Sequence, residues 1–225
     1  MRREGKRLME AETRVLQYLR ETYQPEAILV YGSYAEGSAG RFSDFDALVI
    51  APFPRTHDTT RIGDTPLDVF VYPPETFEGP YDPEEFVQVF DAKILMDANG
   101  LGGRLKKRVL EYLDKLPAKD VDALREEMAW CRKMLERTAR EDVEGNFRWH
   151  WLLCDSLEIY CEVRAWHYFG PKKSLRRMEK EAPEAYALYA RALRDFSQEA
   201  LADWIGYLTE VYESIALEGK ERKLT

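Results

Sequence analysis

The spacing of apolar residues predicts two different kinds of structure in the two halves of the chain. In the first half, short apolar runs rich in β-branched residues begin at Ala27, Phe45 and Leu67, and loops rich in Gly, Pro, Thr and Asp separate them. A further run begins at Lys93, and helical patterns precede and follow these runs. Strands mixed with helices predict a small mixed β-sheet domain.

The second half contains no convincing strand. Apolar residues recur every three or four positions from Val121 to Leu135, as on one buried face of a helix. Further helices are predicted over 146–169, 184–196 and 198–217. Helices joined by short connections are typical of a bundle, so the predicted fold class is α+β, a sheet domain followed by an all-α helical bundle.

The boundary between the halves is predicted within the segment Leu116 to Asp120. Pro117 breaks one helix, and Asp120 is able to cap the next. A chain of 225 residues is long enough for two modest domains. We therefore expect domains at 1–116 and 117–225.

Composition and charge narrow the function classes. A formal net charge of -8 argues against a general nucleic-acid binder and against an extended nucleic-acid surface. We expect no membrane partner, because no apolar stretch approaches the ~20 residues that cross a bilayer. The N-terminus lacks the apolar core of a signal peptide, so a cytoplasmic protein is expected. Cys131, Cys154 and Cys161 lie in helical patterns and are expected to be small buried residues rather than a disulfide framework.

Two aspartates stand one residue apart where the second apolar run begins. On a strand, Asp44 and Asp46 project to the same face. Close carboxylates repel each other, and a divalent cation such as magnesium removes that conflict. Asp68 opens the third run, so all three acids converge if the runs are neighbouring strands. Three acids can hold two metal ions that activate an attacking oxygen and stabilise a phosphoryl leaving group. The alternative is that these aspartates are turn and capping residues.

A Gly-Ser pair follows the first apolar run. Gly32 allows the backbone to approach a ligand closely, and Ser33 offers a hydroxyl and a backbone N–H to a phosphate near a predicted helix start. A simple turn is the alternative explanation.

The Gly-Ser pair, the Ser-Asp-Phe-Asp stretch at 43–46 and Asp68 between apolar residues together resemble the polymerase-β-like nucleotidyltransferase superfamily, over about residues 27–116. The resemblance implies that Asp44, Asp46 and Asp68 bind Mg²⁺ or Mn²⁺. It also implies that Gly32 and Ser33 hold the triphosphate of ATP or another nucleoside triphosphate.

One position departs from the family pattern. Many members that act on small molecules carry an arginine shortly after the Gly-Ser pair, where this chain has Glu36. An acid there repels phosphate, so the phosphate contact is expected from Arg41 or from Lys172 and Lys173 in the helical half. A solvated basic turn is the alternative for the two lysines.

The order of a nucleotidyltransferase domain and a helical bundle is similar to the antibiotic nucleotidyltransferases that modify kanamycin or lincosamides. In the kanamycin enzymes a glutamate from the helical half acts as general base, often across a dimer interface, which leaves a homodimer open here. A helical projection of 146–169 places Glu158 within an apolar stripe, flanked by Asp155 and Glu162. Trp149, Trp151 and Trp166 could line an acceptor pocket. Glu158 is the candidate base; a structural salt bridge is the alternative.

The leading hypothesis is a metal-dependent enzyme that transfers a nucleoside monophosphate, AMP from ATP, to a hydroxyl of a small acceptor and releases pyrophosphate. A protein or RNA acceptor, or a regulatory antitoxin-type partner, is the alternative. The three histidines show no metal or triad spacing, so no role is predicted for them.

Overall fold

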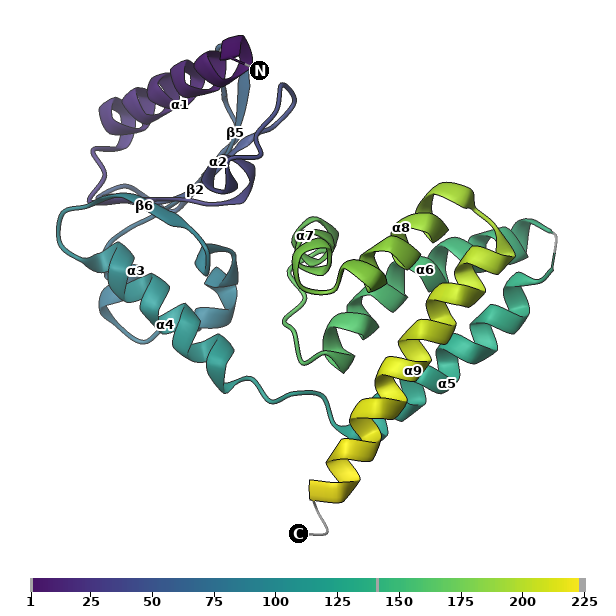
Figure 1. Cartoon of the computed structure of the whole chain (residues 1–225). Helices are drawn as coiled ribbons and strands as arrows, with labels where there is room; N and C mark the ends of the chain where they lie inside the picture. Colours follow the sequence, from purple (N-terminus) through teal and green to yellow (C-terminus); the bar gives the residue numbers. More distant parts are fainter. Residues whose placement is uncertain (1, 141, 223–225) are drawn as a thin grey trace. The chain divides into compact units, whose positions relative to one another are not determined.

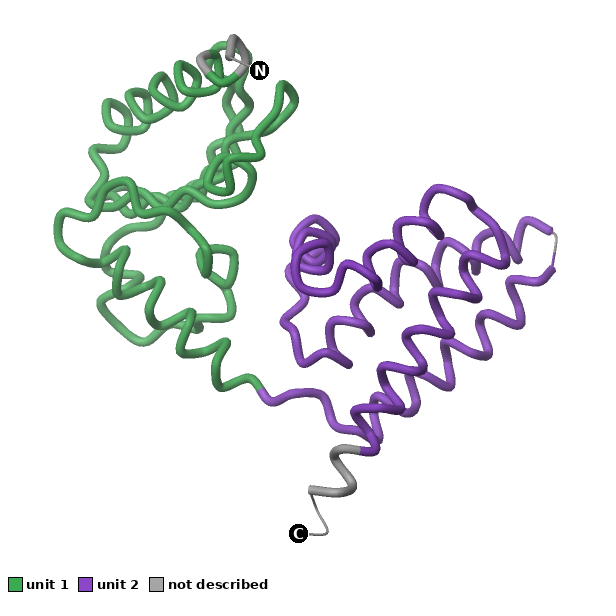
Figure 2. Tube along the Cα trace, viewed as in Figure 1, with its two compact units in different colours: residues 1–116 green, residues 117–225 purple. Residues whose placement is uncertain are grey.

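The computed structural model describes residues 2–140 and 142–222. The chain forms two compact units, residues 1–116 and 117–225 (Figure 2). The first contains a mixed six-stranded sheet and the second a run of helices, which confirms the predicted α+β class.

The sheet of unit 1 has the strand order β3-β5-β2-β1-β6, and β4 pairs with β5. The central pair, β2 and β5, is parallel, and the other pairs are antiparallel. Four of the six strands are the predicted apolar runs. The strands span β1 (Ala27–Val30), β2 (Phe45–Ile50), β3 (Thr56–Asp58), β4 (Arg61–Ile62), β5 (Thr65–Tyr72) and β6 (Lys93–Asp97).

Helices cover both faces of this sheet (Figure 1). On one face, apolar residues of α1 pack against the alternate residues Phe45, Ala47 and Val49 of β2. On the other face, α4 packs on β1 and β6, and Gly102 contacts Leu29. The helices of unit 1 are α1 (Arg2–Tyr23), α2 (Gly32–Glu36), α3 (Glu75–Glu78), the 3₁₀ helix η1 (Pro83–Val89) and α4 (Leu101–Lys115).

A buried carboxylate ties β3 to α1. Asp58 is 5% exposed and accepts hydrogen bonds from the hydroxyls of Tyr23, at 2.7 Å, and Tyr18, at 3.0 Å. Burial alone would raise the pKa of Asp58, but these bonds and two from Thr60 lower it below its ordinary value. The charged form of Asp58 therefore fixes the position of β3.

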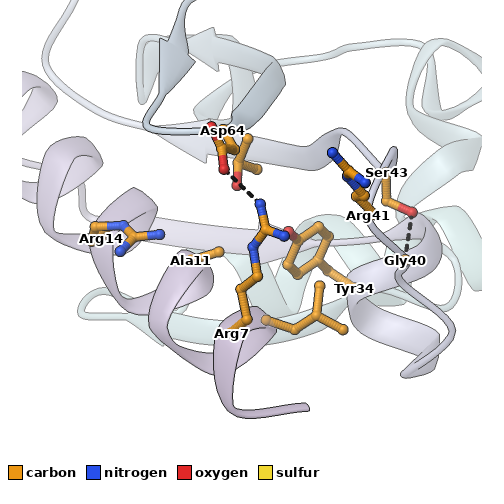
Figure 3. Close-up of a pocket in the computed structure, with 10 residues that line it drawn as sticks. Arg7, Ala11, Arg14, Tyr34, Gly40, Arg41, Ser43 and Asp64 are labelled. Carbon is orange, nitrogen blue, oxygen red and sulfur yellow. Dashed lines mark hydrogen bonds and ion pairs between the residues drawn. The ribbon is translucent and has the colours of Figure 1, made fainter. Parts of the chain in front are cut away.

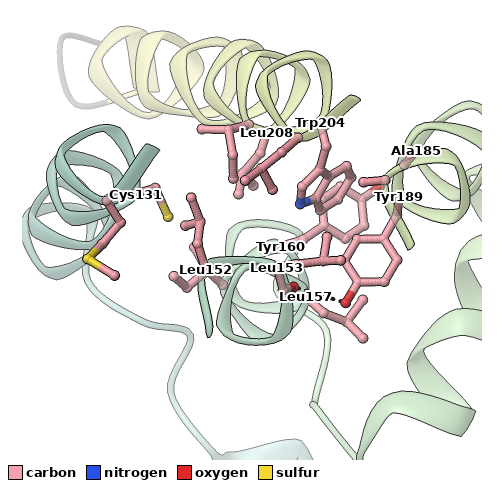
Figure 4. Packing of buried hydrophobic residues seen from close by; sticks show 14 of the residues in the cluster. Cys131, Leu152, Leu153, Leu157, Tyr160, Ala185, Tyr189, Trp204 and Leu208 are labelled. Atoms are coloured by element: carbon pink, nitrogen blue, oxygen red, sulfur yellow. Dashed lines mark hydrogen bonds between the residues drawn. The ribbon is translucent and has the colours of Figure 1, made fainter. Parts of the chain in front are cut away.

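Unit 2 is built around one apolar core (Figure 4). Trp204 of α9 is fully buried, and its Nε1 donates to Oγ of Ser156 in α6 at 2.8 Å. In the part of the chain that the structure describes, no helix has the length and apolar character to span a membrane. The helices of unit 2 are α5 (Val121–Thr138), α6 (Val143–Val163), α7 (Pro171–Glu181), α8 (Pro183–Asp195) and α9 (Gln198–Arg222).

Three expectations about unit 2 were wrong. The helix predicted over 146–169 ends at Val163, because Ala165 adopts a left-handed backbone with φ of 52°. The basic segment after it was left out of the predicted helices, but it forms α7 with Pro171 in its first turn. Cys154 is exposed, whereas Cys131 and Cys161 are buried as expected.

Candidate functional site

The turn after β1 is shaped by a glycine. Gly32 has φ of +64°, and a Cβ at this position would lie 2.2 Å from Oδ2 of Asp46. A side chain is therefore excluded both by the left-handed backbone and by the aspartate. The group that Gly32 approaches closely is the chain's own carboxylate, and its approach to a ligand stays a prediction. Ser33 lies in the first turn of α2, as expected for a helix start, and is partly exposed.

The parallel pairing of β2 and β5 brings two of the predicted aspartates together. Asp46 and Asp68 are direct Cα partners in the register, and both are partly exposed. The two apolar runs are therefore neighbouring strands, which is the condition set for their aspartates to converge. Asp44 immediately precedes β2 and is exposed to solvent.

Tyr31 joins this pair and was missed from the sequence. It lies between β1 and Gly32, and its backbone N–H donates to the carbonyl of Asp46 at 3.1 Å. Burial, followed by the charges of Asp68 and Asp46, raises the pKa of the Tyr31 phenol above its ordinary value. The two negative charges thus favour the neutral form of this buried hydroxyl. The sequence feature that could have revealed Tyr31 is its position directly before the Gly-Ser pair.

The donor chemistry of these residues suits a divalent cation, because Asp46 and Asp68 supply paired carboxylate oxygens. Within residues 2–140 and 142–222, however, no three His, Cys, Asp or Glu side chains are placed to enclose a metal ion. Two of the three predicted ligands are thus adjacent, and Asp44 does not complete a three-group cluster with them. The metal site remains a prediction.

His57 is a second residue that the sequence did not reveal. Its Nε2 lies 2.6 Å from Oδ1 of Asp68. A carboxylate only accepts hydrogen bonds, so the imidazole N–H is the donor in this contact. The imidazole also stacks on Phe70, with ring centroids 4.2 Å apart and planes 2° apart. The contact depends on β3, a strand that the apolar pattern did not predict.

Arg41 lies in a pocket on the loop that leads to Asp44 (Figure 3). Two further arginines, Arg7 and Arg14 of α1, line the same pocket, and Arg7 forms an ion pair with Asp64 at 2.5 Å. The pocket thus combines Arg41 with two cations from a distant part of the sequence and with one carboxylate, and the phosphate contact of Arg41 stays a prediction. Lys172 and Lys173 instead lie in the first turn of α7 in unit 2.

A second pocket, of about 350 Å³, lies within unit 2. Its lining combines four carboxylates, one lysine and two tryptophans, the latter in edge-to-face contact 5.7 Å apart. The lining residues are Lys119, Glu127, Trp130, Trp151, Asp155, Glu158, Ile159 and Glu162.

The environment of Glu158 differs from the prediction. The apolar stripe around it is largely exposed: the side chains of Phe147 and Trp151 are 66% and 45% exposed. The opposite side of α6 packs into the core of unit 2. Glu158 itself is exposed. Partial burial, followed by the charges of Glu162 and Asp155, still raises its pKa above the ordinary value, although Lys119 opposes this.

Lys119 neutralises part of this pocket. It bonds to Glu127 and to Glu162, the latter at 2.8 Å, and these bonds raise its pKa although burial would lower it. Glu127 has a raised pKa as well, chiefly because of burial, and one of its oxygens is buried with no hydrogen-bond partner among the described residues. Three carboxylates remain in excess over the single lysine.

Comparisons with known proteins bear on the family. No curated protein matches the chain significantly. Among solved structures, a nucleotidyltransferase-like protein from Exiguobacterium sibiricum is 14% identical, with a TM-score of 0.37, over 95% of this chain and 77% of that one. A toxin–antitoxin structure with AMP-PNP is 19% identical, with a TM-score of 0.33, over 46% of this chain and 86% of that one. The family model for the nucleotidyltransferase domain matches residues 12–150. That match covers more than half of the sequence, and the chain belongs to the nucleotidyltransferase domain family.

Proposed function

We propose that the protein transfers a nucleoside monophosphate, AMP from ATP, to a hydroxyl of a small acceptor and releases pyrophosphate. The observation that carries this proposal is the pairing of Asp46 with Asp68 beside Gly32. Asp44, Asp46 and Asp68 would hold Mg²⁺ or Mn²⁺, which activates the attacking oxygen and stabilises the leaving group when bound. Gly32, Ser33 and Arg41 would contact the triphosphate.

The acceptor is proposed to bind in the pocket of unit 2. The excess of carboxylates favours a molecule with positive charge, such as an aminated sugar, and the faces of Trp130 and Trp151 suit cations as well as apolar rings. Glu158 would take the proton of the acceptor hydroxyl while that oxygen bonds to the α-phosphorus and pyrophosphate leaves. Its raised pKa and exposure support this role, since a general base works best with a pKa near the operating pH and must reach its substrate. Lys172 and Lys173 remain proposed phosphate contacts.

The test is incubation with ATP labelled at the α-phosphate, Mg²⁺ and a panel of small hydroxylated compounds, with and without amino groups. We expect label on an aminated acceptor, none in EDTA and none with Asp46→Asn. Label on a neutral acceptor alone would contradict the assignment of the pocket. Label on added protein or RNA would identify a different acceptor class, and no transfer to any acceptor would contradict the proposed function.

A further inference from the structure

One of the two paired aspartates is held by a histidine on the outer strand of the sheet. We propose that His57 is a positioning residue for Asp68: it engages Oδ1 and leaves Oδ2 for a divalent cation. The contact that carries the proposal is the 2.6 Å separation of His57 Nε2 and Asp68 Oδ1. The proposal rests on the proposed function, because Asp68 must be a metal ligand for its orientation to matter.

The imidazole is fixed by its neighbours. His57 is the direct antiparallel partner of Phe70, and the near-parallel stacking of their rings restrains rotation about the His57 side-chain bonds. Phe70 and Asp68 lie two residues apart on β5 and so project to the same face. The stacked ring is thereby set beside the carboxylate.

The strand that carries His57 is itself anchored. The next residue, Asp58, is buried and bonded to Tyr18 and Tyr23 of α1. A rigid strand, a stacked ring and a short contact together give His57 a defined position relative to β5.

Such support is useful because the carboxylate is accessible to water. The side chains of His57 and Asp68 are 46% and 40% exposed, so an unsupported Asp68 would be free to rotate. The register places Asp68 beside Asp46, and a shared cation requires both carboxylates to face one point. Groups that hydrogen-bond to metal ligands typically contribute about 10–100-fold to metal affinity.

The experiment measures Mn²⁺ binding to the full chain without nucleotide, from the electron paramagnetic resonance signal of the free ion. We expect His57→Ala to weaken Mn²⁺ binding by about 10–100-fold. His57→Gln should restore part of the affinity, because its amide can donate to the same oxygen. His167→Ala, at an exposed histidine of unit 2, is the matched control and should bind as the unmodified chain does.

Each outcome bears on a separate claim. Unchanged or tighter Mn²⁺ binding by a folded His57→Ala chain would overturn the positioning role and leave the proposed function intact. If the unmodified chain binds no Mn²⁺, both the metal site and this proposal fail. Should His57→Ala not fold, Phe70→Leu removes the stacking partner and keeps the histidine; it should weaken Mn²⁺ binding, and an unmodified affinity would overturn the proposal.

Discussion

The close approach of Gly32 to Asp46 makes a single methyl group a sensitive probe of the site. In Gly32→Ala the new Cβ would lie 2.2 Å from Oδ2 of Asp46 and 3.0 Å from its Cγ. Because the nearest atom is the end of a side chain, the carboxylate must rotate away. The left-handed backbone, with φ of +64°, adds roughly 1–2 kcal/mol of strain for a residue other than glycine.

Gly37 provides a matched control. It also has a positive φ, +75°, but a Cβ there would meet nothing within 4 Å. Gly37→Ala therefore pays the same roughly 1–2 kcal/mol of backbone strain without moving a carboxylate. Gly32→Ala should lose at least as much free energy of unfolding as Gly37→Ala, measured by urea titration and circular dichroism.

The variants should differ in metal binding. Gly32→Ala displaces a proposed ligand and should weaken Mn²⁺ binding by about 10–100-fold, the effect typical of a disturbed ligand orientation. Gly37→Ala should bind Mn²⁺ as the unmodified chain does. Equal Mn²⁺ affinities in the two variants would refute the conclusion that Gly32 is required because it borders the metal site.

Three further substitutions test separate parts of the account. Asp46→Asn should abolish labelled nucleotide transfer with an unchanged circular dichroism spectrum, and more than a few per cent of residual activity would contradict the ligand assignment. Glu158→Gln should lower turnover by roughly 10²-fold while ATP binding and melting temperature stay unchanged, whereas the exposed Glu126→Gln should have no effect on turnover. Tyr23→Phe should cost about 1.5–3 kcal/mol of unfolding free energy at pH 7, because it removes a hydrogen bond to the Asp58 carboxylate. The pKa of Asp58 is lower in the folded state than its unfolded value of about 3.9, so the charged carboxylate stabilises the fold above that pH. The loss of unfolding free energy in Tyr23→Phe should therefore shrink as pH falls through the folded-state pKa of Asp58. A loss that stays constant with pH in urea titrations would contradict this.

The central strands could be predicted because their chemistry is local. Phe45 to Ile50 and Leu67 to Tyr72 are apolar except for one aspartate each, as expected for neighbouring strands with a largely buried sheet position. The aspartates stand near the start of these runs, so parallel pairing brings Asp46 and Asp68 to the same level. That part of the candidate site was therefore accessible from the sequence.

The partners of the aspartates were not predictable in the same way. Strands β3 and β4 have only three and two residues, with Ile62 the one apolar side chain among them, so they show no alternation to detect. Their pairing depends on contacts across the sheet, and the His57 contact with Asp68 depends on that pairing. The helical projection of α6 failed for another reason: apolar residues occur on both sides of the helix, so the pattern alone does not identify the buried side.

The most direct test of the account is calorimetry of ATP binding to the unmodified chain, with Mg²⁺ present and with EDTA in its place. The paired carboxylates of Asp46 and Asp68 repel a triphosphate unless a cation lies between them, so ATP should bind tightly with Mg²⁺ and much more weakly with EDTA. Equal affinity in the two conditions would contradict a metal-dependent nucleotide site at these residues.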